Sequence, residues 1–94
     1  MFVLRIEHPV PDFGAWKQAF DRDPMGRAAS GVRRYRVLRP LDDAHYAVVE
    51  LELETIAEVD ALHERLKELW GGVAGRIIGA PQSRVFEVTE RRDF

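Results

Sequence analysis

Alternating apolar and polar residues predict four β-strands in this chain. The clearest case is the segment 2–8, where Phe2, Leu4 and Ile6 occupy every second position, the period of a strand with one buried face. Pro9 follows and is expected to end the strand, because proline has no N–H to donate to a ladder. Three further strands are expected over residues 32–39, 45–54 and 83–90.

One segment with helical spacing follows the first strand. Residues 13–22 place Phe13, Trp16 and Phe20 on one apolar stripe, directly after Asp12, a residue type that suits a helix cap. A proline and a glycine just beyond this segment are expected to end the helix.

A second helix is predicted by a capping box. In Thr55-Ile-Ala-Glu58, the threonine hydroxyl accepts a hydrogen bond from the backbone N–H of Glu58, and the glutamate side chain accepts one from the backbone of Thr55. The glycines at 71 and 72 are expected to end this helix, because glycine tolerates left-handed backbone angles. Connecting segments are expected at residues 23–31, 41–44 and 73–81, the last with an apolar turn at 77–78.

The order of elements predicts an α+β fold of the ferredoxin-like βαββαβ kind. Two right-handed crossovers would place both helices on one face of a four-stranded antiparallel sheet, with strand order 4-1-3-2. The strand residues expected to face the helices are Phe2, Leu4, Ile6, Ala47, Val49, Leu51, Leu53, Phe86 and Val88. The helix residues expected against them are Phe13, Trp16, Phe20, Ile56, Val59, Leu62 and Leu66. The second strand leaves two choices for its inner side, Tyr35 with Val37 or Val32 with Leu38.

The opposite face of the predicted sheet mixes charged residues with an apolar patch. The patch consists of Val3, Tyr46, Val48 and Val85. Exposed apolar surface of this kind usually marks an interface, and a chain of 94 residues buries only a limited share of its surface by itself. We therefore predict a homodimer through the open sheet face, with Arg5 pairing with Glu50 or Glu52 within or between the copies.

Composition narrows the classes of partner. The 94 residues correspond to one domain, 1–94. A net charge of −2 gives no electrostatic reason to expect nucleic acid or an anionic membrane surface, and no apolar run approaches the roughly 18 residues of a membrane span. The chain has no cysteine, which excludes disulfides and thiolate metal sites and makes a cytoplasmic location the expectation.

Three segments carry a resemblance to a known superfamily. They are Phe13-Gly-Ala-Trp16-Lys-Gln-Ala-Phe20, Asp23-Pro-Met-Gly-Arg27 and Gly31-Val-Arg-Arg-Tyr-Arg-Val-Leu-Arg. Together with the element order, they resemble the dimeric α+β barrel superfamily, which includes antibiotic biosynthesis monooxygenase-like domains and small cyclase-like bacterial proteins. The resemblance covers nearly the whole chain and implies a homodimer with a small-molecule pocket between the sheet and the helices of each subunit. Monooxygenases, cyclases and binding proteins share this architecture, so the fold leaves the reaction open.

Three polar residues are candidates for catalysis: His8, Tyr46 and Arg5. Histidine acts as a general base near neutral pH, and His8 is expected at the rim of the core between sheet and helices. The structural alternative for His8 is a hydrogen-bonded residue that turns the chain into Pro9. Tyr46 and Arg5, together with Glu50, suit either the binding of a substrate carbonyl or phenol, or a structural cluster of charges on the sheet.

The candidate ligand-binding residues are Trp16, Glu50 and Trp70. Both tryptophans also suit plain core positions, because they follow helical spacing. No metal site and no cofactor are expected: the three histidines lack metal-site spacing, and the chain has neither a Gly-rich phosphate loop nor a nucleophile elbow.

Two functions fit these observations, and a third, plainer alternative is an accessory protein that binds no ligand and is held by its dimer interface. The first is a cofactor-independent monooxygenase or cyclase that acts on a small apolar molecule of aromatic or polyketide-like kind. The second is a non-catalytic small-ligand-binding or regulatory module, so the sequence leaves open whether the chain is an enzyme. A cavity on the order of several hundred Å³ between helices and sheet, with convergent polar groups, favours the enzyme, and a closed core favours the module.

Overall fold

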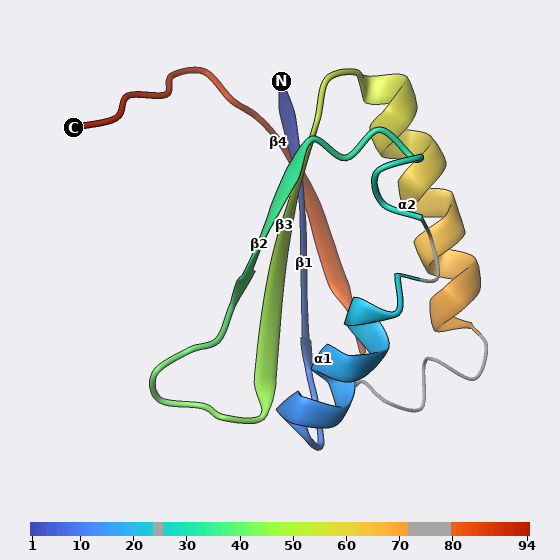
Figure 1. Ribbon diagram of the computed structural model, residues 1–94, viewed down its shortest axis with the longest axis vertical. Coiled ribbons are helices and arrows are strands. Elements are labelled where there is room, and N and C mark those ends of the chain that lie inside the picture. Colours follow the sequence, from blue (N-terminus) through green and yellow to red (C-terminus); the bar gives the residue numbers. More distant parts are fainter. Residues whose placement is uncertain (24–25, 72–79) are drawn as a thin grey trace.

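The chain folds into one sheet covered on one side by two helices. The computed structural model describes residues 1–23, 26–71 and 80–94. Its elements are β1 (Phe2–Pro9), α1 (Phe13–Asp21), β2 (Arg34–Leu38), β3 (Tyr46–Leu53), α2 (Ile56–Trp70) and β4 (Gln82–Glu87). The strand order is β2-β3-β1-β4, and both helices lie on the same face (Figure 1). The predicted fold class and strand order are confirmed, while most of the expected loop at 73–81, including the turn at 77–78, lies outside the described residues.

Both helices begin at the predicted caps. The side chain of Asp12 accepts a hydrogen bond from the backbone N–H of Ala15 at 3.1 Å, which starts α1. The capping box of α2 is complete, because the Thr55 hydroxyl accepts from the Glu58 N–H at 3.1 Å and the Glu58 carboxylate accepts from the Thr55 N–H at 3.2 Å. Each bond satisfies a backbone donor that the first helical turn cannot pair internally.

The core lies between the sheet and the helices. Across the central strand pair, Leu4 faces Leu51 and Ile6 faces Val49, and directly opposed residues of antiparallel strands share one side of the sheet. The buried apolar residues of this core are Leu4, Ile6, Val10, Trp16, Ala47, Val49, Leu51, Leu53, Val59 and Leu62.

One predicted core position on α2 is wrong. Ile56 is 44% exposed, although it precedes buried Val59 by three residues. Ile56 is the first residue of the helix, and Cα–Cβ bonds in a helix tilt toward its N-terminus. Its side chain therefore points past the end of α2 and not onto the sheet.

The facing of β4 is the reverse of the prediction. Val85 lies opposite Leu4, and Phe86 lies opposite Val3, so Val85 faces the helices and Phe86 replaces it in the apolar patch of the open face. Alternation could not decide this, because each side of β4 offers one apolar residue next to polar ones. Only the pairing with β1 sets the facing, since a shift of one residue moves every side chain to the other side.

The pairing of β2 resolves the choice that the sequence left open. Tyr35 lies opposite Leu51 and Val37 lies opposite Val49, so these two side chains face the helices. The Tyr35 ring packs edge-on against Phe20 of α1, with ring centroids 5.3 Å apart. Leu38 and the arginines of β2 therefore belong to the open face.

An arginine in the segment after α1 joins that helix to β2. The guanidinium of Arg27 lies 3.8 Å from the ring centroid of Phe20 and 4.8 Å from that of Tyr35. Its Nη1 donates a hydrogen bond to the Phe20 carbonyl at 2.8 Å. Cation–π contacts to two rings, added to this hydrogen bond, hold α1 beside the sheet edge.

Candidate functional site

His8 occupies the helix-covered side of the sheet at the end of β1. It is only 3% exposed, and its ring packs edge-on against Trp16 with centroids 5.6 Å apart. Its Nδ1 lies 3.3 Å from the carbonyl oxygen of Pro9. Because a carbonyl can only accept, Nδ1 carries the proton of the neutral ring and Nε2 carries the lone pair. The residue therefore has the tautomer of a potential base in an apolar surrounding.

Burial sets the charge state of this histidine. Desolvation lowers the pKa of His8 from its usual value of 6.5, against a smaller opposing effect of the hydrogen bond with Pro9. A buried imidazole loses the hydration that stabilises its charged form. His8 is consequently neutral at pH 7.

This lowered pKa predicts a loss of stability in mild acid. Between the pKa of folded His8 and its unfolded value of 6.5, the unfolded chain binds more protons, so the free energy of unfolding falls as pH drops through that window. Urea unfolding at pH 7.5 and pH 5 should show a smaller acid-induced loss for His8→Gln than for the unmodified chain. Equal losses in the two proteins would show that His8 does not titrate in this way.

A row of aromatic side chains runs from His8 along α1 to β2. Neighbouring ring centroids are 5.4 Å apart for Phe13 and Trp16, 5.3 Å for Trp16 and Phe20, and 5.3 Å for Phe20 and Tyr35. Trp16 is the buried member, 6% exposed. These rings offer the flat, apolar contacts that suit an aromatic molecule.

Tyr46 and Arg5 lie on the other side of the sheet, joined through Glu7. The Tyr46 hydroxyl donates to Glu7 Oε1 at 2.9 Å, and Arg5 Nε donates to Glu7 Oε2 at 3.0 Å. The hydrogen bond to Glu7 raises the pKa of Tyr46, because it stabilises the protonated phenol. Tyr46 is therefore a proton donor at neutral pH.

The predicted catalytic trio is thus divided by the sheet. His8 faces the helices, whereas Arg5 and Tyr46 point away from them, because residues 5 and 8 fall on opposite sides of one strand. The sequence placed His8 at the rim of the core and Arg5 with Tyr46 on the open face, and the structure agrees with both placements. Glu7, which connects two of the three, was not predicted as a site residue, although its position two residues from Arg5 was a usable signal.

The predicted ligand-binding residues are divided in the same way. Trp16 and Trp70 both pack against the core on the helix side, and the Trp70 ring lies 6.5 Å from that of His63. Glu50 lies on the open face, where it pairs with Arg36 and, at 3.8 Å, with Arg5. The structure therefore assigns Glu50 to a network of charges and not to the aromatic side.

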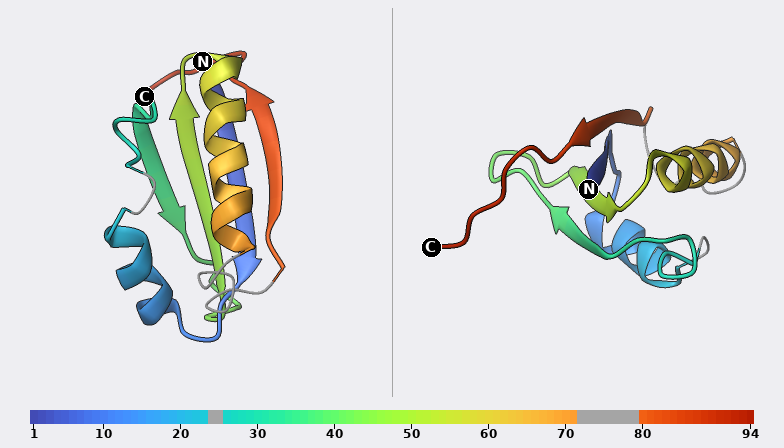
Figure 2. Two further views of the ribbon diagram at one scale, coloured as in Figure 1. Left: turned by 90° about the vertical axis from the view of Figure 1, so that its right-hand side faces the viewer. Right: turned by 90° about the horizontal axis from the view of Figure 1, so that it is seen from above.

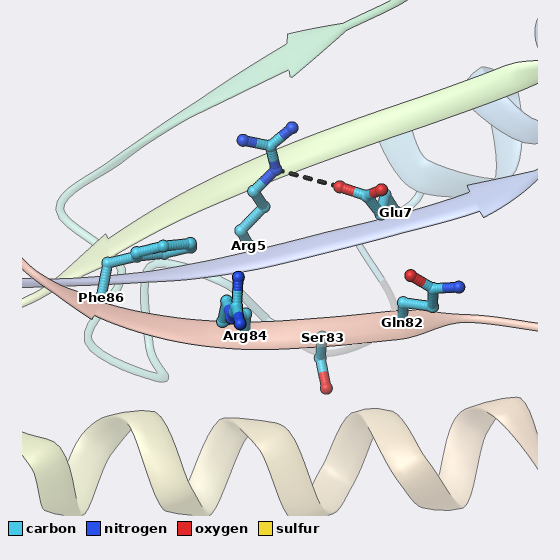
Figure 3. Close-up of a pocket in the computed structure, with 6 residues that line it drawn as sticks. All are labelled: Arg5, Glu7, Gln82, Ser83, Arg84 and Phe86. Atoms are coloured by element: carbon cyan, nitrogen blue, oxygen red, sulfur yellow. Dashed lines mark hydrogen bonds and ion pairs between the residues drawn. The ribbon is translucent and has the colours of Figure 1, made fainter.

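The open face carries two grooves. The larger, of about 540 Å³, is lined by Arg5, Glu7, Gln82, Ser83, Arg84 and Phe86 (Figure 3). The smaller, of about 280 Å³, is lined by Val3, Arg34, Arg36, Glu50, Glu52 and Arg91. Figure 3 shows Arg5 and Phe86 on the side of the sheet away from α2, while Ser83 points toward that helix.

The described residues offer no ready metal site. Across residues 1–23, 26–71 and 80–94, no three histidine, aspartate or glutamate side chains come together as a group that could hold a metal ion. In the same part of the chain, no helix has the length and hydropathy needed to cross a membrane.

Comparison with known proteins gives matches in structure but not in sequence. No protein-family model matches the chain, and no curated protein matches its sequence. A point mutant of SnoaB, a cofactor-independent oxygenase from Streptomyces nogalater, is 15% identical, with a TM-score of 0.76 over 96% of this chain and 94% of that one. A candidate antibiotic biosynthesis monooxygenase from Nitrosomonas europaea is 15% identical, with a TM-score of 0.73 over 94% and 89%.

This chain shares the ferredoxin-like α+β fold of these proteins. A dimeric ferredoxin-like protein from an uncultured marine organism shares it at 10% identity, with a TM-score of 0.70 over 98% of this chain and 92% of that one. The superfamily resemblance predicted from the sequence is therefore confirmed at the level of fold. Because a fold hosts many activities, the residues of the site must carry the functional argument.

Proposed function

We propose that this chain is a homodimeric, cofactor-independent oxygenase that acts on a small hydroxylated aromatic molecule. The observation that carries the proposal is His8, a buried neutral histidine beside Trp16. A neutral imidazole in apolar surroundings accepts a proton from a bound phenol or enol, and general-base catalysis of this kind contributes about 10²–10⁴-fold in rate. The aromatic row of α1 supplies the surface against which the substrate ring lies.

The proposed oxygenation requires a general base and a site that excludes water. Removing the hydroxyl proton gives an electron-rich anion that reacts with molecular oxygen. One oxygen atom enters the ring as a carbonyl group, and the other leaves as water with the two hydrogens that the substrate loses. His8 is nearly enclosed in the free protein, so the substrate enters by local opening of α1 from the sheet, a motion typical of enzyme lids.

The dimer part of the proposal rests on the open face of the sheet. Val3 and Phe86 lie opposite one another there, and Phe86 is 40% exposed. Leu38, which pairs with Val48 of β3, adds a further exposed apolar side chain on the same side. Apolar residues between paired charges are typical of an interface core with a polar rim. That a matched protein is a dimeric ferredoxin-like protein supports a homodimer.

Oxygen uptake tests the enzymatic proposal. A panel of anthrones, hydroxynaphthalenes and simple phenols is screened for consumption of dissolved oxygen, and the product mass separates oxygenation from loss of water by cyclisation. We expect His8→Gln to lower the rate on an active substrate by about 10²–10⁴-fold. His45→Gln is the matched control, because His45 also contacts a proline carbonyl, at 3.0 Å from Pro11, but is exposed. Full activity of His8→Gln would remove this residue from the mechanism.

The second candidate is a non-catalytic ligand-binding module, and the tight packing of the core favours it. Leu4, Leu53 and Val59 have no exposed surface between sheet and helices, and such packing disfavours a substrate cavity there, whereas the grooves of the open face remain accessible to a ligand. A thermal-shift screen with the same phenols, with quinones and with haem separates the two functions. A stabilising ligand that is recovered unchanged, with no oxygen uptake, identifies the binding module.

A further inference from the structure

We propose that the larger groove of the open face binds a small aromatic carboxylate, a molecule with one negative charge and one flat apolar ring system. Arg84 holds the carboxylate, and Phe86 contacts the ring. This groove lies on the other side of the sheet from His8, so the site is separate from that of the proposed oxygenase. Only its effect on association rests on the homodimer of the proposed function.

Arg84 carries a charge that no carboxylate of its own subunit neutralises. It lies directly opposite Arg5 on the neighbouring strand, and like charges at opposed positions of a sheet are destabilising. Arg5 pairs with Glu7 at 3.0 Å, whereas Arg84 forms no ion pair within residues 1–23, 26–71 and 80–94. The remaining residues, 24–25 and 72–79, include no aspartate or glutamate. The Arg84 guanidinium is therefore available for bidentate hydrogen bonds with the carboxylate of a ligand.

The charges that line the groove favour a ligand with a single negative charge. Two arginines, Arg5 and Arg84, face one carboxylate, that of Glu7, so the lining has one positive charge in excess. A monocarboxylate matches this excess. A phosphate monoester carries a charge of about −1.5 to −2 at neutral pH, which exceeds it and would be repelled by Glu7.

An aromatic side chain at one end of the groove favours a ring in the ligand. Phe86 is 40% exposed and follows Arg84 by two residues, so both side chains lie on the same side of β4. Figure 3 shows Phe86 at one end of the groove and Gln82 at the other, with Arg84 between them. A ligand whose carboxylate lies on Arg84 can therefore place its ring against Phe86, in the offset or edge-on contact that aromatic pairs prefer.

The groove is open and large enough for such a molecule. Figure 2 shows both helices on the opposite side of the sheet, so neither of them covers the groove. Its volume of about 540 Å³ lies within the range of about 300–1,000 Å³ that is typical of small-molecule sites. A ligand can reach Arg84 without any movement of the fold.

A bound carboxylate also changes what happens when two open faces meet. In a symmetric dimer each subunit offers the same patch to the other, so each copy brings the unpaired charge of Arg84 toward the interface. An uncompensated buried charge is costly. Because the ligand neutralises Arg84 in both copies, we expect it to strengthen the homodimer.

Calorimetric titration with 1-naphthoate tests the site. We expect a dissociation constant of about 100 μM to 1 mM, as suits a ligand of this size. Arg84→Gln should weaken binding by about 10-fold or more, because it removes charge-assisted hydrogen bonds, and Phe86→Leu by about 3-fold, because it removes the ring contact. Arg22→Gln makes the same charge change at an exposed residue after α1 and should bind 1-naphthoate like the unmodified chain.

Two further probes separate the contributions of charge and ring. 1-Naphthamide has the same ring system without the charge, and it should bind about 10-fold more weakly than 1-naphthoate or worse. Cyclohexanecarboxylate has the charge without an aromatic ring, and it should bind about 3-fold more weakly. Circular dichroism of every variant confirms that the comparison is made between folded proteins.

Sedimentation equilibrium with and without 1-naphthoate tests the effect on association. The ligand should lower the dimer dissociation constant of the unmodified chain and leave that of Arg84→Gln unchanged, since this variant has no charge to neutralise. A ligand that binds but weakens the dimer would overturn this part of the inference.

The site itself is overturned by any of three results. They are no binding of 1-naphthoate up to about 10 mM, equal binding by Arg84→Gln, and equal affinity for 1-naphthamide. A chain that stays monomeric at about 100 μM, well above the micromolar dissociation constants of weak complexes, contradicts the homodimer of the proposed function. The calorimetric comparison of Arg84→Gln with Arg22→Gln then decides on the groove by itself.

Discussion

Replacing Trp16 by alanine is expected to lower the free energy of unfolding by about 3–5 kcal/mol. Trp16 is 6% exposed and contacts the rings of His8, Phe13 and Phe20, so its removal leaves a cavity where α1 meets the sheet. Because a small domain typically has a total stability of about 5–15 kcal/mol, the variant should lose a large share of its stability. Urea unfolding followed by far-ultraviolet circular dichroism measures the loss.

Gln18→Ala serves as the control for this prediction. Gln18 lies on the exposed side of the same helix, so the substitution changes the helix without opening the core, and surface changes are usually within about 0.5 kcal/mol. A loss below about 1 kcal/mol for Trp16→Ala would mean that α1 is not held to the sheet by this side chain. The aromatic row proposed as the substrate surface would then lack a fixed position.

A matched pair on β4 is expected to separate folding from dimerisation. Val85 and Phe86 are adjacent and both 40% exposed, but they face opposite sides of the sheet. Phe86→Asp should raise the dimer dissociation constant by about 30- to 1000-fold, because aromatic anchors contribute about 2–4 kcal/mol to an interface. Val85→Asp should instead lower the free energy of unfolding by about 1–3 kcal/mol, since it places a charge beside the apolar core.

Sedimentation equilibrium and urea unfolding of both variants distinguish these outcomes. The reverse result, with Val85→Asp breaking the dimer and Phe86→Asp unfolding the chain, would restore the facing predicted from the sequence and contradict the observed register. If neither variant changes association, the open face is not the interface.

The helices and the central strands were predictable because their signals are local. The capping box of Thr55 and Glu58 involves residues three apart, and the alternation of β1 appears in consecutive residues of one short segment. Such patterns depend on the backbone geometry of residues close together in the sequence, so the folded chain shows the same helix start and the same strand that the pattern predicts. The order of elements then limited the topology, and the strand order followed.

The candidate site was only partly predictable. His8 was correctly placed beside the core, because it continues the alternation of Leu4 and Ile6. The open-face placement of Arg5 and Tyr46 followed from alternation as well, whereas their link through Glu7 was not predicted. Successive side chains of a strand point to opposite sides of the sheet. His8 is two residues from Ile6 and therefore faces the helices, whereas Arg5 is next to Ile6 and faces away from them.

The amino-acid pattern alone therefore determined the fold class, the helix starts and the inner side of β1 and β3, because each depends on short-range periodicity. Only the tertiary structure decided which side β2 and β4 present, since edge strands with polar and apolar residues on both sides take their facing from hydrogen-bond register with a neighbour. The same register left Arg84 opposite Arg5, with no carboxylate of its own in the part of the chain that the structure describes. That charge arrangement arises from contacts between residues far apart in the chain, which no local pattern encodes.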